Sequence, residues 1–239
     1  MRIERFSISD RFCGPPRSGN GGYVCARIAK HLEGPVAVRL KTPPPLNAAL
    51  RLESSEEVAH LFQDAVLIGE ARRTQLDLQE PPCPTFEQAE QSATAFLGFK
   101  NHAFPRCFVC GPDRQPTDGL RIFPGPLASS STIAAPWITD NSIADENGIV
   151  KSEFLWAALD CTGGFAVLPL PAGVAIVLGE LCASFAGTID CGERCVVMGW
   201  PLGVQGRKRL AGSAVYTEGG RLVAKARAVW VEVPLSAWS

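Results

Sequence analysis

The segment 152–168, SEFLWAALDCTGGFAVL, constrains the fold most strongly, because it is apolar on almost every face of the helix that it predicts. Such a helix has to be buried on most of its sides. A curved antiparallel sheet wrapped round one helix provides that burial. Four β-like stretches follow, and Thr217–Gly220 predicts a hairpin between the last two. These stretches are AIVLGELCASF, ERCVVMGW, RKRLAGSAVY and RLVAKARAVWVEV.

The first part of the chain has the same organisation. GGYVCARIAKHL predicts a helix with Val24, Ile28 and Leu32 on one face. Four stretches with β-branched residues and some alternation follow it, PVAVRLKT, AALRLES, EVAHLFQ and AVLIGEARR. We therefore predict an α+β fold with two curved antiparallel sheets, each wrapped round a central helix. The two sheets can join edge to edge, which removes exposed edges.

A Pro-rich segment at 80–84 divides the two parts. We predict an N-terminal unit at 1–80, a linker and connecting helix at 81–104, and a C-terminal unit at 105–239. The helix is TFEQAEQSATAFLGF, with Thr85 as N-cap and Gln88 three residues further on. GLRIF and SSTIAAPW predict the first strands of the C-terminal unit.

Composition excludes several classes of function. The formal net charge is −1, without the basic excess of a nucleic-acid-binding protein. No apolar run reaches the roughly 18 residues that a membrane span requires, and the N-terminus lacks the apolar core of a signal peptide. We expect a cytoplasmic protein without nucleic-acid or membrane partners, whose nine cysteines stay reduced.

Three motifs resemble one group of proteins. Cys107-Phe-Val-Cys110-Gly111, followed by GLRI at 119–122, is similar to the opening of hotdog-fold thioesterases of the phenylacetate and 4-hydroxybenzoyl-CoA types. FLWAALD, ending at Asp160, resembles the central-helix motif that supplies their catalytic acid. Asn20-Gly-Gly-Tyr resembles the first unit of double-hotdog acyl-CoA thioesterases. The resemblance implies a double hotdog that hydrolyses acyl-CoA, with coenzyme A as part of the substrate and no separate cofactor. It leaves a homo-oligomer open.

The departures from the family pattern are complementary. The family places a glycine step, whose amide is the oxyanion donor, about eight residues before the acid. Eight residues before Asp160 the chain has Lys151-Ser152-Glu153 instead, and eight residues after Gly21 it has Ala29. Because the acid and the glycine come from opposite units in this group, the resemblance implies one working site of two.

The residues themselves suggest roles, each beside a structural alternative. Amides at a helix N-terminus suit an oxyanion, so we assign Gly22 and Gly21 to that task and Asn20 to orienting carbonyl or water. These three residues are also a normal helix cap. Asp160, in apolar surroundings, is assigned as general base or nucleophile, or else it hydrogen-bonds Thr162 or nearby backbone.

Further assignments rest on less specific sequence patterns. Thr162 could position water, and Glu180 could hydrogen-bond near the site or form a structural pair. The cluster Arg207-Lys208-Arg209 could bind coenzyme A phosphates or be solvated.

A zinc site is a separate alternative. Cys107 and Cys110 have standard ligand spacing, and Cys83 and His102 could complete a tetrahedral site. The family does not usually use a metal there, and we assign none.

Two other functions stay open, a non-catalytic acyl-CoA or lipid binder and an enoyl-CoA hydratase, although the Asp-His pair of hotdog hydratases is not visible. A serine-hydrolase elbow and a phosphate-binding loop are absent from the sequence.

Overall fold

The computed structural model describes residues 1–128 and 130–238. Its strands are β1 (Arg2–Phe6), β2 (Val36–Leu40), β3 (Leu50–Ser54), β4 (Val58–Gln63), β5 (Val66–Arg73), β6 (Gly125–Pro126), β7 (Ile133–Ile138), β8 (Val174–Phe185), β9 (Arg194–Gln205), β10 (Lys208–Thr217) and β11 (Leu222–Pro234). Its α-helices are α1 (Gly21–Ala29), α2 (Phe86–Ala93) and α3 (Ser152–Phe165), and short 3-10 turns lie at Asp10–Phe12, Leu97–Phe99, Asn141–Ile143 and Leu235–Trp238.

The described strands form one antiparallel sheet of eleven strands in the order β1-β3-β4-β5-β2-β8-β11-β10-β9-β7-β6. Strands from the first 80 residues make up one side of this order. They meet the rest where β2 pairs with β8, in a register that places Val36 opposite Ala183 and Arg39 opposite Glu180. The two expected sheets are therefore one continuous sheet in this structure. Backbone hydrogen bonds at the seam cover the edges that β2 and β8 would otherwise expose.

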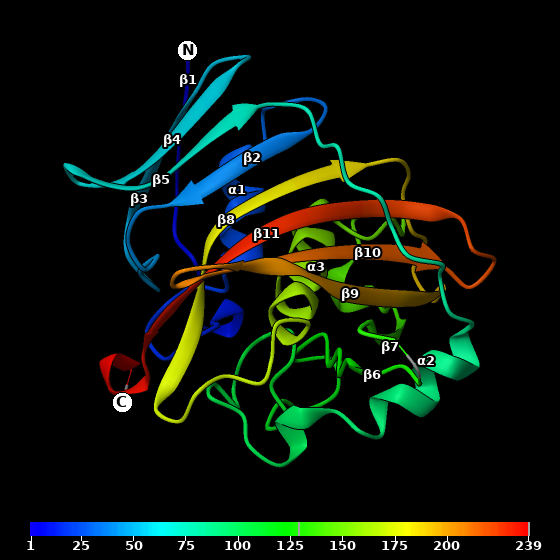
Figure 1. The fold of residues 1–239 in the computed structure, drawn as a ribbon. Coiled ribbons are helices and arrows are strands. Elements are labelled where there is room, and N and C mark those ends of the chain that lie inside the picture. Colours follow the sequence, from blue (N-terminus) through cyan, green and yellow to red (C-terminus); the bar gives the residue numbers. More distant parts are fainter. Residues whose placement is uncertain (129, 239) are drawn as a thin grey trace.

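The sheet curves over both central helices (Figure 1). Helix α1 contacts β2, β4, β5 and β8, and α3 contacts β7 to β11. The predicted apolar helix is confirmed, because eleven of its fourteen residues are buried. The larger of two hydrophobic clusters runs through both parts of the molecule, from Ile8 through the two helices to Trp230, and a smaller one lies round Phe86.

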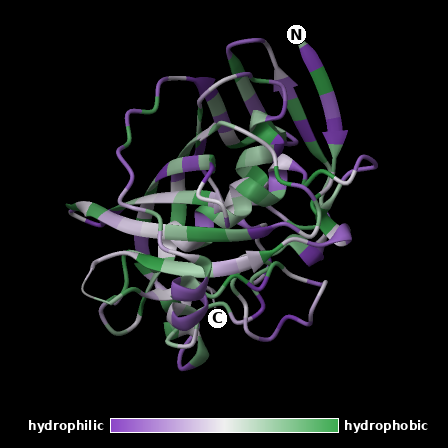
Figure 2. Cartoon of the chain, turned by 90° about the vertical axis from the view of Figure 1, so that its right-hand side faces the viewer, coloured by the Kyte–Doolittle hydropathy of each residue, from purple (hydrophilic) through white to green (hydrophobic). Residues whose placement is uncertain are grey.

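Local sequence signals account for most element boundaries. The Asn20 side chain accepts a hydrogen bond from the Tyr23 N–H (3.0 Å) and begins α1. Thr85 and Gln88 form the predicted capping box of α2. Apolar residues are interspersed with charged ones along β1, which is visible as bands of colour in Figure 2.

One predicted strand is wrong. The GLRI segment, 119–122, has no strand structure, and the next strand along the chain is the two-residue β6. Arg121 has a φ of 52°, a left-handed conformation that interrupts an extended strand. Its guanidinium donates to the Arg114 carbonyl oxygen, which holds this segment against the preceding loop.

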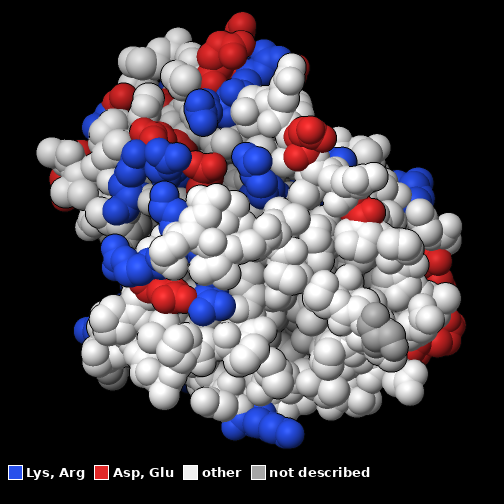
Figure 3. Space-filling view, in the orientation of Figure 1, with Lys and Arg blue, Asp and Glu red and all other residues white. Residues whose placement is uncertain are grey.

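Charge is unevenly distributed over the face seen in Figure 3. Lys, Arg, Asp and Glu crowd the part that holds β1 to β5, whereas much of the face over β9 to β11 carries none. None of the described helices combines the length and the hydropathy that crossing a bilayer requires.

Candidate active site

The N-terminus of α1 lies directly against α3. A Cβ added at Gly22 would be 2.4 Å from the Trp156 carbonyl oxygen and 2.5 Å from the Asp160 Cβ. A residue with a side chain at Gly22 would therefore force the helices apart. The glycine step of the first part and the acid of the second part meet at this contact.

Asp160 is held by the first part of the chain. The Gly22 N–H donates to Asp160 Oδ2 with an N···O distance of 2.7 Å. The residue is 2% exposed, and its Oδ1 has no hydrogen-bond partner within the described part of the chain. Burial raises the pKa of Asp160 to about 8, and the Gly22 hydrogen bond opposes that shift. A buried carboxyl with one oxygen fixed and the other unpaired is an arrangement typical of functional sites.

The remaining amides of the first turn of α1 divide into bonded and free ones. The Tyr23 N–H donates to the Asn20 side chain, and the Val24 N–H donates to the Asn20 carbonyl. The Gly21 N–H has no acceptor among the described residues. A Cβ at Gly21 would lie 3.3 Å from Asp160 Oδ2, so this backbone borders the carboxyl. Gly21 therefore offers an unpaired amide at the positive end of the helix dipole, beside the acid.

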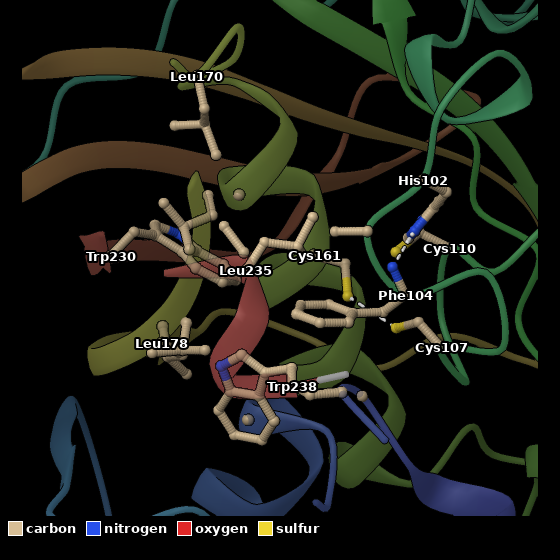
Figure 4. Close-up of a pocket in the computed structure, with 18 of the residues that line it drawn as sticks. His102, Phe104, Cys107, Cys110, Cys161, Leu170, Leu178, Trp230, Leu235 and Trp238 are labelled. Atoms are coloured by element: carbon tan, nitrogen blue, oxygen red, sulfur yellow. Dashed lines mark hydrogen bonds between the residues drawn. The ribbon is translucent and has the colours of Figure 1, made fainter. Parts of the chain in front are cut away.

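A cavity of about 480 Å³ reaches these groups. Asn20, Gly21 and Asp160 border it, and much of the remaining wall is apolar. Figure 4 shows Trp230, Leu178, Leu235 and Trp238 gathered on one side, with Phe104 and a group of cysteines on the other. The wall is thus built by β8, β11, α3, the C-terminal turn and the loop before Cys107.

The CFVCG segment is fixed between the two helices. Its Phe108 packs edge-on against Phe12 (ring centroids 5.1 Å), which itself stacks on Tyr23 of α1 at 4.2 Å. Phe108 also contacts Phe154 of α3, and its N–H donates to the Cys13 carbonyl. These contacts carry the flanking cysteines to the cavity wall.

Three buried thiols gather there. Cys107 Sγ lies 3.6 Å from Cys161 Sγ, and the sulfurs of Cys107, Cys110 and Cys161 all lie within 4.8 Å of one another. The Asn20 Nδ2 donates toward Cys161 Sγ at 3.4 Å and Cys107 Sγ at 3.9 Å. The pKa of Cys107 is well below its usual range, because the Cys110 and Cys161 thiols and nearby backbone N–H groups hydrogen-bond its sulfur.

Other predicted residues lie away from this cavity. Thr162 is fully buried, and its hydroxyl has no partner within the described residues. Glu180 accepts from the Arg39 guanidinium (2.7 Å) and lines a separate hollow with His60 and Glu70. The structure does not bring Glu180 to Asp160, because Glu180 and the cavity-lining Leu178 face different sides of β8, where a bulge lies opposite Val229.

The predicted basic cluster is also outside the cavity wall. Arg207 and Lys208 are exposed at the β9–β10 turn, and Arg209 pairs with Glu232 at 2.6 Å. Two exposed arginines that sequence reasoning missed, Arg17 and Arg106, line a hollow that shares Gly14 and Phe104 with the cavity. Neither belongs to a motif, so only the fold reveals them.

Cys161 was likewise missed as a neighbour of the CxxC pair. It follows Asp160 in a helix 54 residues after Cys107, and no ligand spacing connects the two in the sequence. Cys83, one of the alternative zinc ligands predicted from the sequence, lies instead beside a smaller hydrophobic cluster with Phe86 and Leu78. Burial raises the pKa of Cys83 to about 11.

Comparisons with known proteins agree with this architecture. No protein-family model and no curated protein sequence matches the chain. The tesB protein of Mycobacterium avium subsp. paratuberculosis has a similar structure, with a TM-score of 0.60 and 11% identity over 97% of this chain and 93% of its own. A proposed thioesterase from Novosphingobium aromaticivorans has a TM-score of 0.60 and 12% identity, covering 96% and 94%.

These similarities define the class of fold. The chain has, along nearly its whole length, the fold of structures described as thioesterases, and its large antiparallel sheet with few helices fits a hotdog fold. The resemblance predicted from the CFVCG and FLWAALD motifs is confirmed at this level.

Proposed function

We propose that this protein is a fused pair of hotdog units that hydrolyses acyl-CoA thioesters at one site between the two helices. The observation that carries this proposal is the 2.7 Å hydrogen bond from the Gly22 N–H to Asp160 Oδ2, beside the unpaired Gly21 N–H, at the wall of an apolar cavity. An ionisable oxygen from one half and amides from the other thereby border one space.

In this proposal, the two neighbouring amides of Gly21 and Gly22 have different tasks. The Gly22 N–H orients the Asp160 carboxyl and leaves Oδ1 unpaired. Asp160 then attacks the thioester carbonyl carbon or takes a proton from a water that attacks it. In the water route, the water oxygen bonds the carbonyl carbon, the C–S bond breaks, and Asp160 passes the proton it has taken to the departing coenzyme A sulfur. In the nucleophilic route, the Asp160 carboxylate forms an acyl anhydride and coenzyme A leaves as the thiolate. A water then hydrolyses the anhydride, which restores Asp160 and supplies the proton that the thiolate takes up. The Gly21 N–H is the donor for the oxygen that becomes negative, a task for which one donor typically contributes about 100-fold or more in rate.

A single site follows from what each helix lacks. At the position in α1 that corresponds to Asp160 stands Ala29, a buried residue without ionisable chemistry. At the start of α3 stand Lys151, Ser152 and Glu153 in place of the glycine step. The reciprocal site therefore has neither the acid nor the close-approach glycine.

The two ends of the substrate have different surroundings. The apolar wall around Trp230, Leu178 and Leu235 suits an acyl group, because transferring apolar surface out of water is favourable. The exposed guanidinium groups of Arg17 and Arg106, in the adjoining hollow, suit the phosphates of coenzyme A. Arg207 and Lys208, which the sequence suggested for the same role, lie outside the cavity wall.

The proposal is tested by hydrolysis of a panel of acyl-CoA chain lengths. Loss of the ultraviolet thioester absorbance is the suitable signal, since nine protein cysteines would react with thiol reagents. Asp160→Asn is expected to lower kcat by at least about 100-fold, the contribution of a positioned acid or base. Asp64→Asn, at the exposed β4–β5 turn, is the matched control and should keep the parent rate.

Two outcomes would contradict the proposal, one its mechanism and the other its enzymatic activity. Equal rates for Asp160→Asn and the parent would remove Asp160 from the mechanism. Calorimetric binding of acyl-CoA with no turnover of any chain length would favour the non-catalytic binder.

Turnover in ¹⁸O-water distinguishes nucleophilic attack by Asp160 from general-base activation of water, because only a nucleophilic Asp160 acquires ¹⁸O in its carboxyl group.

A further inference from the structure

Three thiols from two distant segments converge at the cavity wall. Cys107 and Cys110 lie in the loop that precedes the second half, and Cys161 lies in α3 next to Asp160. All three side chains are buried, at 3 to 7% exposure. Figure 4 shows the Cys107 and Cys161 side chains pointing toward each other on one side of the cavity, with Cys110 beside them.

The spacing of the sulfurs matches that of a tetrahedral thiolate site. Zinc–sulfur bonds of about 2.3 Å at tetrahedral angles place the sulfurs about 3.8 Å apart. The observed Cys107–Cys161 separation is 3.6 Å, and each pair lies within 4.8 Å. A shift of about 1 Å or less would bring all three sulfurs to the spacing of ligands round one ion.

The loop is shaped for such a role. The Gly111 N–H donates to the Cys107 carbonyl (2.9 Å), which closes a tight turn round the CxxC pair. A Cβ at Gly111 would be 2.5 Å from that same carbonyl oxygen, so the turn requires glycine. Hydrogen bonds from Leu120 to Phe108 and from Ile122 to Val109 hold the turn in place.

We propose that Cys107, Cys110 and Cys161 bind a zinc ion whose fourth position opens into the cavity. Binding deprotonates three thiols, releases three protons and leaves a Zn(Cys)₃ group with one net negative charge. The positive end of α1 and the Asn20 amide, which already points at Cys161 and Cys107, offset that charge. The proposal does not depend on the proposed hydrolysis.

The other two zinc ligands that the sequence suggested, Cys83 and His102, lie outside this group of sulfurs. Cys83 packs beside the separate cluster round Phe86. The His102 Nδ1 accepts the Phe104 N–H at 2.9 Å, and His102 is not part of the group of mutually close ligand atoms. Within the described residues, three sulfurs form the group, which leaves a position for water or a substrate sulfur.

Metal content of the intact chain, purified under reducing conditions without chelator, tests the proposal. We expect one zinc ion per chain by mass spectrometry of the metal. Cys107→Ser, Cys110→Ser and Cys161→Ser should each weaken zinc binding by more than about 100-fold, since loss of an outer partner alone costs 10- to 100-fold. Cys83→Ser is the matched control and should keep the full content, as should His102→Ala.

A second measurement uses the parent protein and so does not depend on the folding of variants. Chelated, metal-free protein is titrated with Co²⁺, and thiolate-to-cobalt charge transfer with tetrahedral visible bands is expected at one equivalent. Added pantetheine should then increase the charge-transfer intensity, because its thiolate fills the open position.

Several results would overturn the inference. These are absence of bound zinc together with absence of a charge-transfer band, a disulfide between two of the three cysteines in the reduced preparation, or loss of metal in Cys83→Ser. A cobalt spectrum that pantetheine leaves unchanged would contradict the open position.

Discussion

At the scale of single residues, the site depends on glycines for two different reasons. Gly22 is required by space, because an added Cβ would meet the α3 backbone at 2.4 Å. Gly21 supplies the unpaired amide and borders Asp160. Gly163, in the last turn of α3, has neither constraint, since a Cβ there would meet nothing closer than 3.6 Å.

This contrast gives a prediction for stability. Gly22→Ala should lower the free energy of unfolding by about 1–3 kcal/mol or more through overpacking between α1 and α3. Gly163→Ala should instead leave it unchanged or raise it by about 0.5–1 kcal/mol, because alanine favours helix interiors. Urea unfolding of both variants measures the difference, and equal effects would mean that the helices are not in close contact at Gly22.

A second residue-scale prediction concerns the coenzyme A end of the substrate. The double variant Arg17→Ala and Arg106→Ala should raise KM for acyl-CoA by about tenfold, the effect of losing a charged hydrogen bond. It should leave KM for the matching acyl-pantetheine, which lacks the nucleotide, unchanged. The matched control is Arg207→Ala with Lys208→Ala, an exposed pair outside the cavity wall. A larger rise in KM for that control would indicate that the phosphates bind at the β9–β10 turn.

The sequence alone could identify Asp160, Gly21, Gly22 and Asn20 as candidate site residues, because each belongs to a local pattern. The pattern is an acid in an apolar helix or a glycine step at the start of a helix. It could not divide the tasks of the two glycines, since that depends on which amide Asp160 Oδ2 meets. Cys161 reaches the cavity, and Arg17 and Arg106 reach the adjoining hollow, only through tertiary contacts, and no spacing in the chain marks them.

At the scale of elements, caps and periodicity predicted most helices and strands. The main error is the strand predicted at GLRI, and it arises at one backbone angle, the φ of Arg121. GLRI has the composition of a strand, but Arg121 adopts a left-handed φ and its side chain bonds the Arg114 carbonyl. Composition does not reveal such a tertiary contact. The capping box of α2, by contrast, is a local interaction and was predictable from Thr85 and Gln88.

The capping box yields an element-scale prediction. Thr85→Ala removes the hydroxyl that accepts the Gln88 N–H (3.2 Å) and should cost about 1 kcal/mol of stability. Thr85→Ser keeps that acceptor and should cost a few tenths at most. Thermal unfolding monitored by circular dichroism compares the two, and a serine variant as unstable as the alanine variant would contradict the capping role.

At the scale of the whole molecule, the two halves share a sheet, a core and a candidate site. The seam between β2 and β8 lies beside the contact of α1 with α3, so each half covers surface that the other would expose. The sequence predicted two helix-and-sheet units and their edge-to-edge joining, but not the continuous order of strands, because pairing partners are set by long-range contacts.

Shared burial predicts cooperative folding. The full chain should unfold in a single calorimetric transition. Residues 81–239 alone, which would expose the β8 edge and one side of α3, should aggregate or bind a hydrophobic dye. Coexpression with residues 1–80 should restore the soluble complex. A stable, cooperatively folding 81–239 fragment would show that the halves are independent.

In the proposed reaction, one group from each half of the chain acts on the same carbonyl. A crystal structure of Asp160→Asn with an acyl-CoA analogue in which a methylene replaces the thioester sulfur tests it most directly. We predict the ketone oxygen at about 2.7–3.1 Å from the Gly21 N–H, with the side chain of residue 160 against the carbonyl carbon and the acyl chain between Trp230 and Leu178. An analogue bound with its carbonyl away from both Gly21 and residue 160 would rule out a reaction shared between the two halves.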